Sequence, residues 1–209
     1  MTIKLSDDDL KNSDVYVHFV DILFAVVLGQ SFVLLSAKLG NWLVNLGSYL
    51  LQVLTMLLVY GLVITSWVGY HRSVKAYPIR NPLRFIVDII LLFLYYFAFV
   101  SVEDFGRVIL LFLATFVAYV IWDFLRVTEY WSDSGNRTVI VKRCGVSVAF
   151  VVMLYLVWVL YPYMSAQSLL VGVLWLTILI LLILYRSFKW KYETEFGRRG
   201  SGKVTDYSG

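Results

Sequence analysis

The chain has 209 residues, of which 60% are hydrophobic and 15% are charged, and its mean hydropathy is +0.78. Soluble domains carry about a quarter of their residues as Asp, Glu, Lys or Arg. This composition therefore excludes an ordinary water-soluble protein, and much of the apolar surface must face lipid. The net charge of +4 does not indicate nucleic acid as a partner, because the basic residues follow the ends of apolar segments instead of forming one stripe.

The N-terminal lead, residues 1–14, is polar and has Asp7, Asp8 and Asp9 at its centre. A secretory signal peptide begins with a basic region, so we expect the first apolar segment to be retained. The single cysteine, Cys144, offers neither an intrachain disulfide nor a structural metal site. We expect it to be a small helix residue.

Six apolar segments follow, each near the length of about 20 residues that crosses the hydrocarbon core as a helix. They cover 15–37, 42–70, 84–102, 107–130, 143–162 and 167–186. Backbone polar groups in lipid must bond to one another, which favours helices over open strands. The predicted fold class is all-α: a polytopic membrane protein with six transmembrane helices over residues 15–186. Residues 187–209 are expected to form a polar, basic and flexible tail.

The joints between the segments contain the residues that commonly interrupt helices. They are Gly40-Asn41, Pro78 with Asn81-Pro82, Gly106, residues 132–136 and Pro162. All three prolines are thus predicted to lie between helices, where none of them kinks a helix interior.

The distribution of Lys and Arg predicts the orientation. The N-terminal lead, the second joint, the fourth joint and the tail contain 16 of the 18 basic residues, and the other side has only Lys38 and Arg107. Loops rich in Lys and Arg stay in the cytoplasm. Both termini are therefore predicted to be cytoplasmic, and the basic tail is expected to attract anionic lipid headgroups.

Several polar side chains lie within the apolar segments, where each charge costs about 2.5–3.5 kcal/mol on insertion scales. They are His18 and Asp21, His71 and Arg72, Asp88, and Asp123 and Arg126. Because successive helices alternate in direction, all seven fall at the cytoplasmic ends of four helices and can form one network. One interpretation is a structural clasp in which Asp21 and Asp88 pair with His71, Arg72 or Arg126. The other is that this clasp also shapes an ion path along the first helix.

Two further patterns involve residues that are close together in the sequence. Asp123 and Arg126 are three residues apart, the spacing of a pair within one helix. Gln30 lies near the middle of the first segment, flanked by Gly29 and Ser31. Its amide predicts either a hydrogen bond between helices or a helix face that lines water.

No pattern of catalytic residues is found. The chain has two histidines and no metal-ligand spacing, nucleophile elbow or glycine-rich phosphate loop. We therefore expect no enzyme activity, no catalytic residue, no cofactor and no bound metal.

Two motifs resemble those of the transmembrane protein 175 family of potassium channels, found in endosomes, lysosomes and bacteria. Phe19-Val20-Asp21-Ile22-Leu23-Phe24-Ala25 is similar to the Phe-Ser-Asp-x-x-x-Ala start of that family's first helix. Trp67-Val68-Gly69-Tyr70-His71-Arg72 is similar to its Trp-x-x-His-His-Arg ending of the second helix. Asp88 stands about where the family has an asparagine. The resemblance covers roughly residues 15–100.

The resemblance implies six spans with cytoplasmic ends and, as in the bacterial members, a homotetramer whose four first helices line the pore. The pore and gate residues would be Val26, Gly29, Gln30 and Val33, with Val26 at the constriction. The motif network would be His18, Phe19, Asp21, Trp67, His71, Arg72 and Asp88. This chain departs from the family at Val15, Val20 and Gly29, where the family has arginine, serine and threonine.

These observations lead to the hypothesis of a potassium-permeable cation channel gated by apolar side chains that exclude water from the pore. The host membrane would be the cell membrane of a prokaryote or the endosomal or lysosomal membrane of a eukaryote. Two alternatives stay open. One is a non-conducting sensor or partner-binding subunit, and the other is a proton-coupled transporter that uses Asp21 or Asp88.

Overall fold

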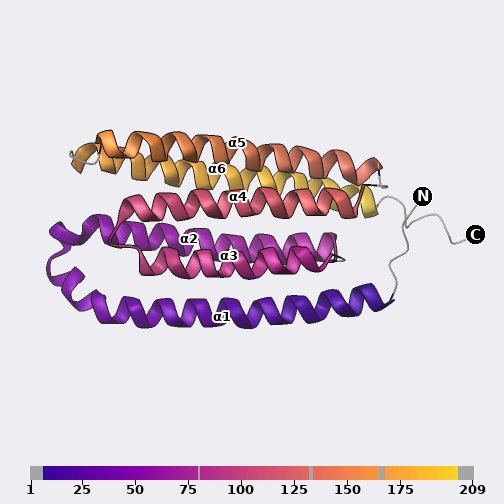
Figure 1. Cartoon of the computed structure of the whole chain (residues 1–209), viewed down its shortest axis with the longest axis horizontal. Helices are drawn as coiled ribbons and strands as arrows, with labels where there is room; N and C mark the ends of the chain where they lie inside the picture. The colour runs from indigo at the N-terminus through magenta and orange to yellow at the C-terminus, as the bar shows by residue number, and fades with distance from the viewer. Residues whose placement is uncertain (1–6, 80, 132–133, 165–167, 202–209) are drawn as a thin grey trace, which may run out of the picture.

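The computed structural model describes residues 7–79, 81–131, 134–164 and 168–201, and these form six α-helices and no strand (Figure 1). The helices are α1 (Asp7–Val44), α2 (Leu46–Ala76), α3 (Pro82–Val100), α4 (Phe105–Glu129), α5 (Ser134–Met164) and α6 (Ser168–Ser201). All six are long and apolar enough to cross a membrane. The prediction of an all-α fold with six such helices is confirmed for the described residues.

The helices run up and down in one bundle (Figure 1). α1 lies at one edge and packs against α2 and α3, whereas α6 packs against α5 and α2 near the opposite edge. α4 is central and packs against α3 and α5. We call the end at which α1 begins and α6 ends the terminal end. The α2–α3 and α4–α5 connections also lie there (Figure 1).

The core follows the helical repeat of α4. Phe105, Val108, Ile109, Phe112 and Phe116 recur at intervals of three or four residues and are all buried. The outer surface of the bundle is apolar as well, with large exposed side chains on every helix. An apolar stripe inside and apolar side chains outside are what a helical bundle surrounded by lipid requires.

The first joint lies four residues later than predicted. Gly40 and Asn41 are inside α1, which continues to Val44, and the chain turns at Asn45. The backbone N–H of Asn45 still donates to the carbonyl of Asn41 at 3.2 Å, and its own carbonyl accepts from Ser48 at 2.9 Å. The continued helix brings Trp42 into the core with 2% of its surface exposed. Burial of this indole outweighs the weak helix propensity of Gly40.

The prediction that all three prolines lie between helices is wrong for Pro82, the first residue of α3, where proline is well tolerated. It is also wrong for Pro162, which is within the last turn of α5. Proline removes one backbone hydrogen bond and crowds the preceding turn. Helix α5 ends two residues later, at Met164, so the disruption falls at its terminus. At its other end α5 begins at Ser134, well before the predicted residue 143.

Helix α6 continues beyond residue 186, where we placed the start of the tail, and reaches Ser201. Tyr185 and Lys189 are both buried, with 2% and 5% of their surfaces exposed. Packing of these side chains on one helix face carries the helix past the apolar segment. Residues 202–209, including Lys203, and residues 1–6 lie outside the described residues.

Replacement of Gly106 by alanine should loosen the packing of α4 on α5. A Cβ atom at Gly106 would lie 2.6 Å from Cε1 of Tyr161, whereas one at Gly145 would meet nothing within 4 Å. Overpacking of this kind costs about 1–3 kcal/mol. Gly106→Ala should therefore lower the melting temperature of the detergent-solubilised protein, and Gly145→Ala should leave it unchanged or raise it. Equal melting temperatures for the two variants would contradict the assigned contact.

Candidate functional site

A partly exposed polar group joins α1 to α2. Oδ1 of Asp21 accepts a hydrogen bond from Nε1 of Trp67 at 3.0 Å and lies 2.8 Å from Nε2 of His71. About a third of the Asp21 and His71 side chains is exposed. The structure thus brings together three residues of the predicted motif network, one from the first motif and two from the second.

The remaining motif residues make other contacts. Nδ1 of His18 lies 2.7 Å from the carbonyl oxygen of Asp14, one turn earlier on its own helix. Phe19 packs edge-on against Phe85, with ring centroids 5.5 Å apart. The guanidinium of Arg72 lies over the ring of Trp190 from α6. Asp88 is buried deeper in the bundle.

The predicted pore residues lie on the outer face of α1. Val26 and Val33 are 53% and 61% exposed, and Gly29 and Gln30 are exposed as well. Val26 and Gln30 also line a shallow apolar groove between α1 and α3. Helix α1 therefore presents a continuous unpacked face, and an amide interrupts this face near the middle of the span.

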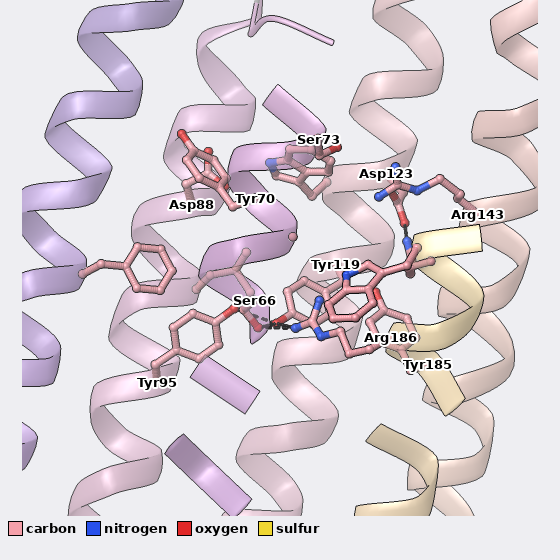
Figure 2. A pocket seen from close by; sticks show the side chains of 16 residues that line it. Ser66, Tyr70, Ser73, Asp88, Tyr95, Tyr119, Asp123, Arg143, Tyr185 and Arg186 are labelled. Carbon is pink, nitrogen blue, oxygen red and sulfur yellow. Dashed lines mark hydrogen bonds and ion pairs between the residues drawn. The ribbon is translucent and has the colours of Figure 1, made fainter. Parts of the chain in front are cut away.

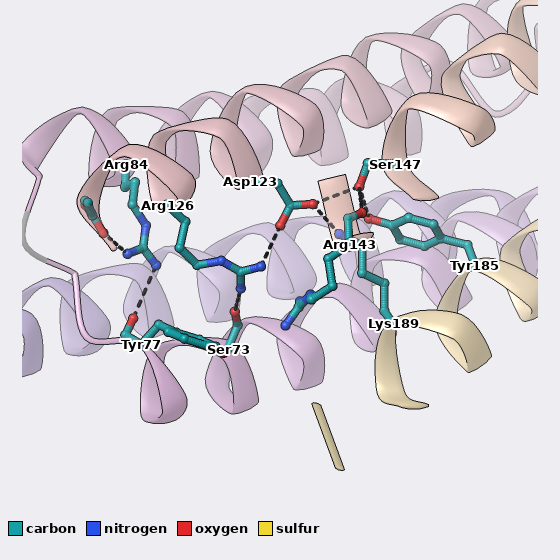
Figure 3. Close-up of polar contacts among 10 residues, drawn as sticks. Ser73, Tyr77, Arg84, Asp123, Arg126, Arg143, Ser147, Tyr185 and Lys189 are labelled. Atoms are coloured by element: carbon teal, nitrogen blue, oxygen red, sulfur yellow. Dashed lines mark hydrogen bonds and ion pairs between the residues drawn. The ribbon is translucent and has the colours of Figure 1, made fainter. Parts of the chain in front are cut away.

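A second, fully buried polar group surrounds Asp123 on α4 (Figure 3). Oδ1 of Asp123 accepts from Nη2 of Arg126 at 3.1 Å, and Oδ2 accepts from Oγ of Ser147 at 2.8 Å and from the ammonium of Lys189. We call these four residues the Asp123 cluster. The predicted pair of Asp123 with Arg126 is present, as part of a larger group that includes α5 and α6.

The Asp123 cluster also reaches α2. Nη1 of Arg126 donates to Oγ of Ser73 at 2.7 Å, and Oγ of Ser147 lies 3.3 Å from the hydroxyl of Tyr185 (Figure 3). Side chains from α2, α4, α5 and α6 are therefore joined through one carboxylate. Each part needs the others, because a charge left without its partner in a buried site is costly.

A neighbouring ion pair joins α3 to α4. Arg84 pairs with Glu129, and Oε1 of Glu129 accepts from the backbone N–H of Asn81 at 2.7 Å. The Arg84 guanidinium lies 4.3 Å from the ring centroid of Trp122, and that of Arg126 lies 5.2 Å from it. Two fully buried guanidiniums thus share one indole, and cation–π attraction adds to their ion pairs.

A cavity of about 70 Å³ lies between these groups (Figure 2). On one side Arg186 extends toward α2 and α4, where it meets Ser66 and Tyr119. The hydroxyl of Tyr95 lies 2.7 Å from that of Tyr119. Asp88 also lines the cavity, and its buried Oδ2 has no hydrogen-bond partner among the described residues. Polar side chains line part of this space, which is large enough for water-sized occupants.

The described hydrogen bonds divide the predicted polar residues into separate groups. Asp21 belongs to the α1–α2 group, Asp123 and Arg126 to the Asp123 cluster, and Asp88 to the cavity wall. Sequence reasoning missed most of the partners in the buried groups, including four charged or polar residues far from their partners in the chain. These are Glu129, Ser147, Arg186 and Lys189.

The positions of the polar residues along α4 could have predicted this site. Trp122, Asp123, Arg126 and Val127 continue the buried stripe of Phe112 and Phe116 at helical intervals. Polar residues at core positions must meet partners from other helices, so this pattern predicts a buried network. It does not say which helix supplies the partners.

No model of a protein family, no curated protein and no solved structure matches this chain. Among the described residues, no group of three or more His, Cys, Asp or Glu side chains could hold a metal ion.

Replacement of Asp123 by asparagine should destabilise the bundle strongly. The change leaves Arg126 and Lys189 buried without their carboxylate, and breaking a buried ion pair from one side costs about 3–5 kcal/mol. The matched control is Asp104→Asn, because Asp104 forms an exposed pair with Arg107 and an exposed pair contributes about 1 kcal/mol or less. Thermal unfolding in detergent should show a large decrease for Asp123→Asn only. Similar decreases for both variants would disprove the central role of Asp123.

Proposed function

We propose that the chain crosses the membrane six times, with the terminal end in the cytoplasm. The charge distribution supports this orientation. At the opposite end Lys38 pairs with Glu103 at 2.6 Å and Arg107 pairs with Asp104 at 2.8 Å, so the basic residues there are matched by acids. The excess of Lys and Arg lies at the terminal end, as expected for the cytoplasmic side.

Within this membrane topology, we infer that the protein is a homo-oligomeric cation channel whose pore is lined by α1. The observation that carries the proposal is the exposed amide of Gln30 on the unpacked face of α1. Lipid offers an amide no hydrogen bond, so this face favours water or a second copy of the helix. Because α1 lies at the edge of the bundle, several copies can bring this face to a common axis.

The side chains along the exposed face of α1 fit a gate in which apolar side chains lie between polar ones. Val26 lies one turn before Gln30 and is the constriction implied by the family resemblance, and Val33 lies one turn after it. Toward the terminal end, the partly exposed carboxylate of Asp21 places negative charge near the proposed entrance. A narrow apolar ring stops ions by excluding water, while nearby carboxylates favour cations.

Potassium as the ion and a tetramer as the assembly are proposed from the family resemblance, as are the candidate host membranes. In the structure, residues of the two motifs that carry this resemblance are in contact, since Asp21 meets Trp67 and His71. This contact holds α1 against α2, so it can set the angle of the pore helix.

One observation favours a second candidate function, a proton-coupled transporter. Asp88 is 4% exposed, and its Oδ2 faces the cavity without a hydrogen-bond partner among the described residues. A carboxylate in this position can exchange a proton with cavity water. Under this reading Asp88→Asn abolishes transport, whereas a channel lined by α1 keeps conducting.

The orientation can be tested by labelling single cysteines in a Cys144→Ala background. Asn45 is exposed at the α1–α2 joint and Trp131 is 58% exposed after α4, at the terminal end. A membrane-impermeant thiol reagent added to intact cells should label Asn45→Cys and should label Trp131→Cys only after permeabilisation. Labelling of both variants in intact cells, or the reverse pattern, would disprove the proposed orientation.

The channel can be tested with purified protein in liposomes. The wild-type protein should pass potassium, and Val26→Asn should raise the flux several-fold because a polar ring stays hydrated. The matched control is Val152→Asn, which places the same amide on α5 at a position that is also 53% exposed. An absence of flux from wild type and Val26→Asn, or an equal rise in both variants, would count decisively against a pore along α1.

Cross-linking distinguishes an oligomer that has α1 at its axis but does not conduct from a protein in which copies of α1 do not meet. In the Cys144→Ala background, Val26→Cys should form disulfide-linked dimers under mild oxidation, because copies of α1 meet at the axis. Val152→Cys faces outward on α5 and should stay monomeric. Cross-links without flux would indicate a non-conducting oligomer, and no cross-links at Val26 would contradict an axis lined by α1.

A further inference from the structure

The guanidinium of Arg186 is surrounded by hydroxyl groups. Its Nε donates to Oγ1 of Thr65 at 3.0 Å, and its Nη2 contacts the hydroxyls of Ser66 and Tyr119 (Figure 2). Among the described residues, none of its hydrogen-bond partners is a carboxylate. Hydroxyl groups satisfy its N–H donors but supply no negative charge, so the cation is solvated without being neutralised.

Among the described residues, the cavity region has more buried bases than acids. The described acids that are buried there are Asp88, Asp123 and Glu129. Four described bases that are buried or half-buried there outnumber them, namely Arg84, Arg126, Arg186 and Lys189. Glu129 is matched by Arg84, and Asp123 by Arg126 and Lys189 together. An uncompensated positive charge inside a bundle surrounded by lipid is costly, so this excess favours an anion.

The positive charge is concentrated on one side of the cavity. Arg186 and Lys189 enter from α6 and Arg143 from α5, while Asp88 faces the space from α3 and Asp123 from α4. Asp123 already accepts from two cations, which leaves Asp88 as the negative group on the opposite wall. An anion is therefore expected next to Arg186, away from Asp88.

Arg186 lines the cavity and approaches the backbone of α2 closely at Gly69. Nη1 makes none of the three contacts described above, and it lies 3.2 Å from the position that a Cβ atom at Gly69 would occupy. A glycine at this position lets the guanidinium approach the backbone of α2. The cavity volume of about 70 Å³ holds one or two species of water size, since water takes about 30 Å³ in the liquid.

We propose that this cavity is a binding site for a small monovalent anion of the halide class, held by the charge of Arg186 and its Nη1 group, while the hydroxyls of Ser66 and Tyr119 accept from Nη2 and position the guanidinium. The anion contributes the negative charge that the hydroxyls lack, and it ties α6 to α2 and α4. The site is inside one subunit and does not depend on the proposed pore, so its test does not use ion flux.

The experiment measures thermal unfolding of the full chain in detergent at constant pH and ionic strength. Sodium chloride and sodium bromide should raise the melting temperature by a few degrees over sodium gluconate, whose anion does not fit, and the rise should saturate with concentration. Arg186→Gln should lose this rise. Arg107→Gln removes an exposed guanidinium at the other end of the bundle and should keep it.

Substitution of Asp88 should change the chloride affinity in the direction opposite to substitution of Arg186. At a pH high enough to ionise Asp88, Asp88→Asn removes a negative charge from the opposite wall and should lower the half-saturating chloride concentration several-fold. If Arg186→Gln does not fold, Ser66→Ala and Tyr119→Phe keep the guanidinium and remove two of its hydroxyl neighbours. Both should raise the half-saturating concentration. Crystals grown in bromide should show an anomalous peak in the cavity.

The proposal is overturned by any of three results. The first is equal stabilisation by chloride and gluconate, and the second is a halide effect that persists unchanged in Arg186→Gln. The third is stabilisation that follows the cation at fixed anion and disappears in Asp88→Asn, which would assign the cavity to a cation. Bromide peaks confined to the outer surface would show an adventitious ion only.

Discussion

Asp123 lies on α4, the helix that packs between α3 and α5, and its two carboxylate oxygens accept hydrogen bonds from a guanidinium, an ammonium and a hydroxyl. In water such contacts would contribute little, because each group is well solvated in either state. In an apolar bundle the same contacts become obligatory, since the cost of an unpaired buried charge exceeds that of most packing defects. The terminal halves of α2, α4, α5 and α6 are therefore held in one relative arrangement by the requirement to keep Asp123, Arg126 and Lys189 together.

The attachment of α1 to this scaffold is of a different kind. Its polar contacts are the partly exposed group in which Asp21 meets Trp67 and His71, and the buried Ser31, which donates to the hydroxyl of Tyr60. The rest of its inner face is apolar, with Val20, Phe24 and Val27 in the core. A change on the outer face of α1 does not require the Asp123 cluster to rearrange. This separation suits a lining helix carried on a fixed bundle, because the lining can vary without loss of the fold.

The number of helices could be predicted from the sequence because a bilayer-length apolar run has few other stable structures. The boundaries could not, because tertiary packing decides them. Burial of Trp42 extends α1, and burial of Tyr185 and Lys189 extends α6. The candidate site was predictable only where both partners lie on one helix, as Asp123 and Arg126 do. Lys189 is 66 residues from Asp123 in the chain, and its position after the apolar run gave it the appearance of a tail residue.

The proposed anion site and the proposed cation pore also constrain each other electrostatically. The positive charge of Arg186, whose described partners are hydroxyls, raises the potential in the terminal half of the bundle, and low-dielectric surroundings screen it weakly. A cation approaching along α1 would meet this potential, which Asp21 offsets only in part. An anion beside Arg186 would remove one positive charge from the interior and so lower the barrier for the cation. The two proposals are thus compatible for a physical reason: the charge that stabilises α6 against α2 is the charge that would otherwise oppose conduction past α1.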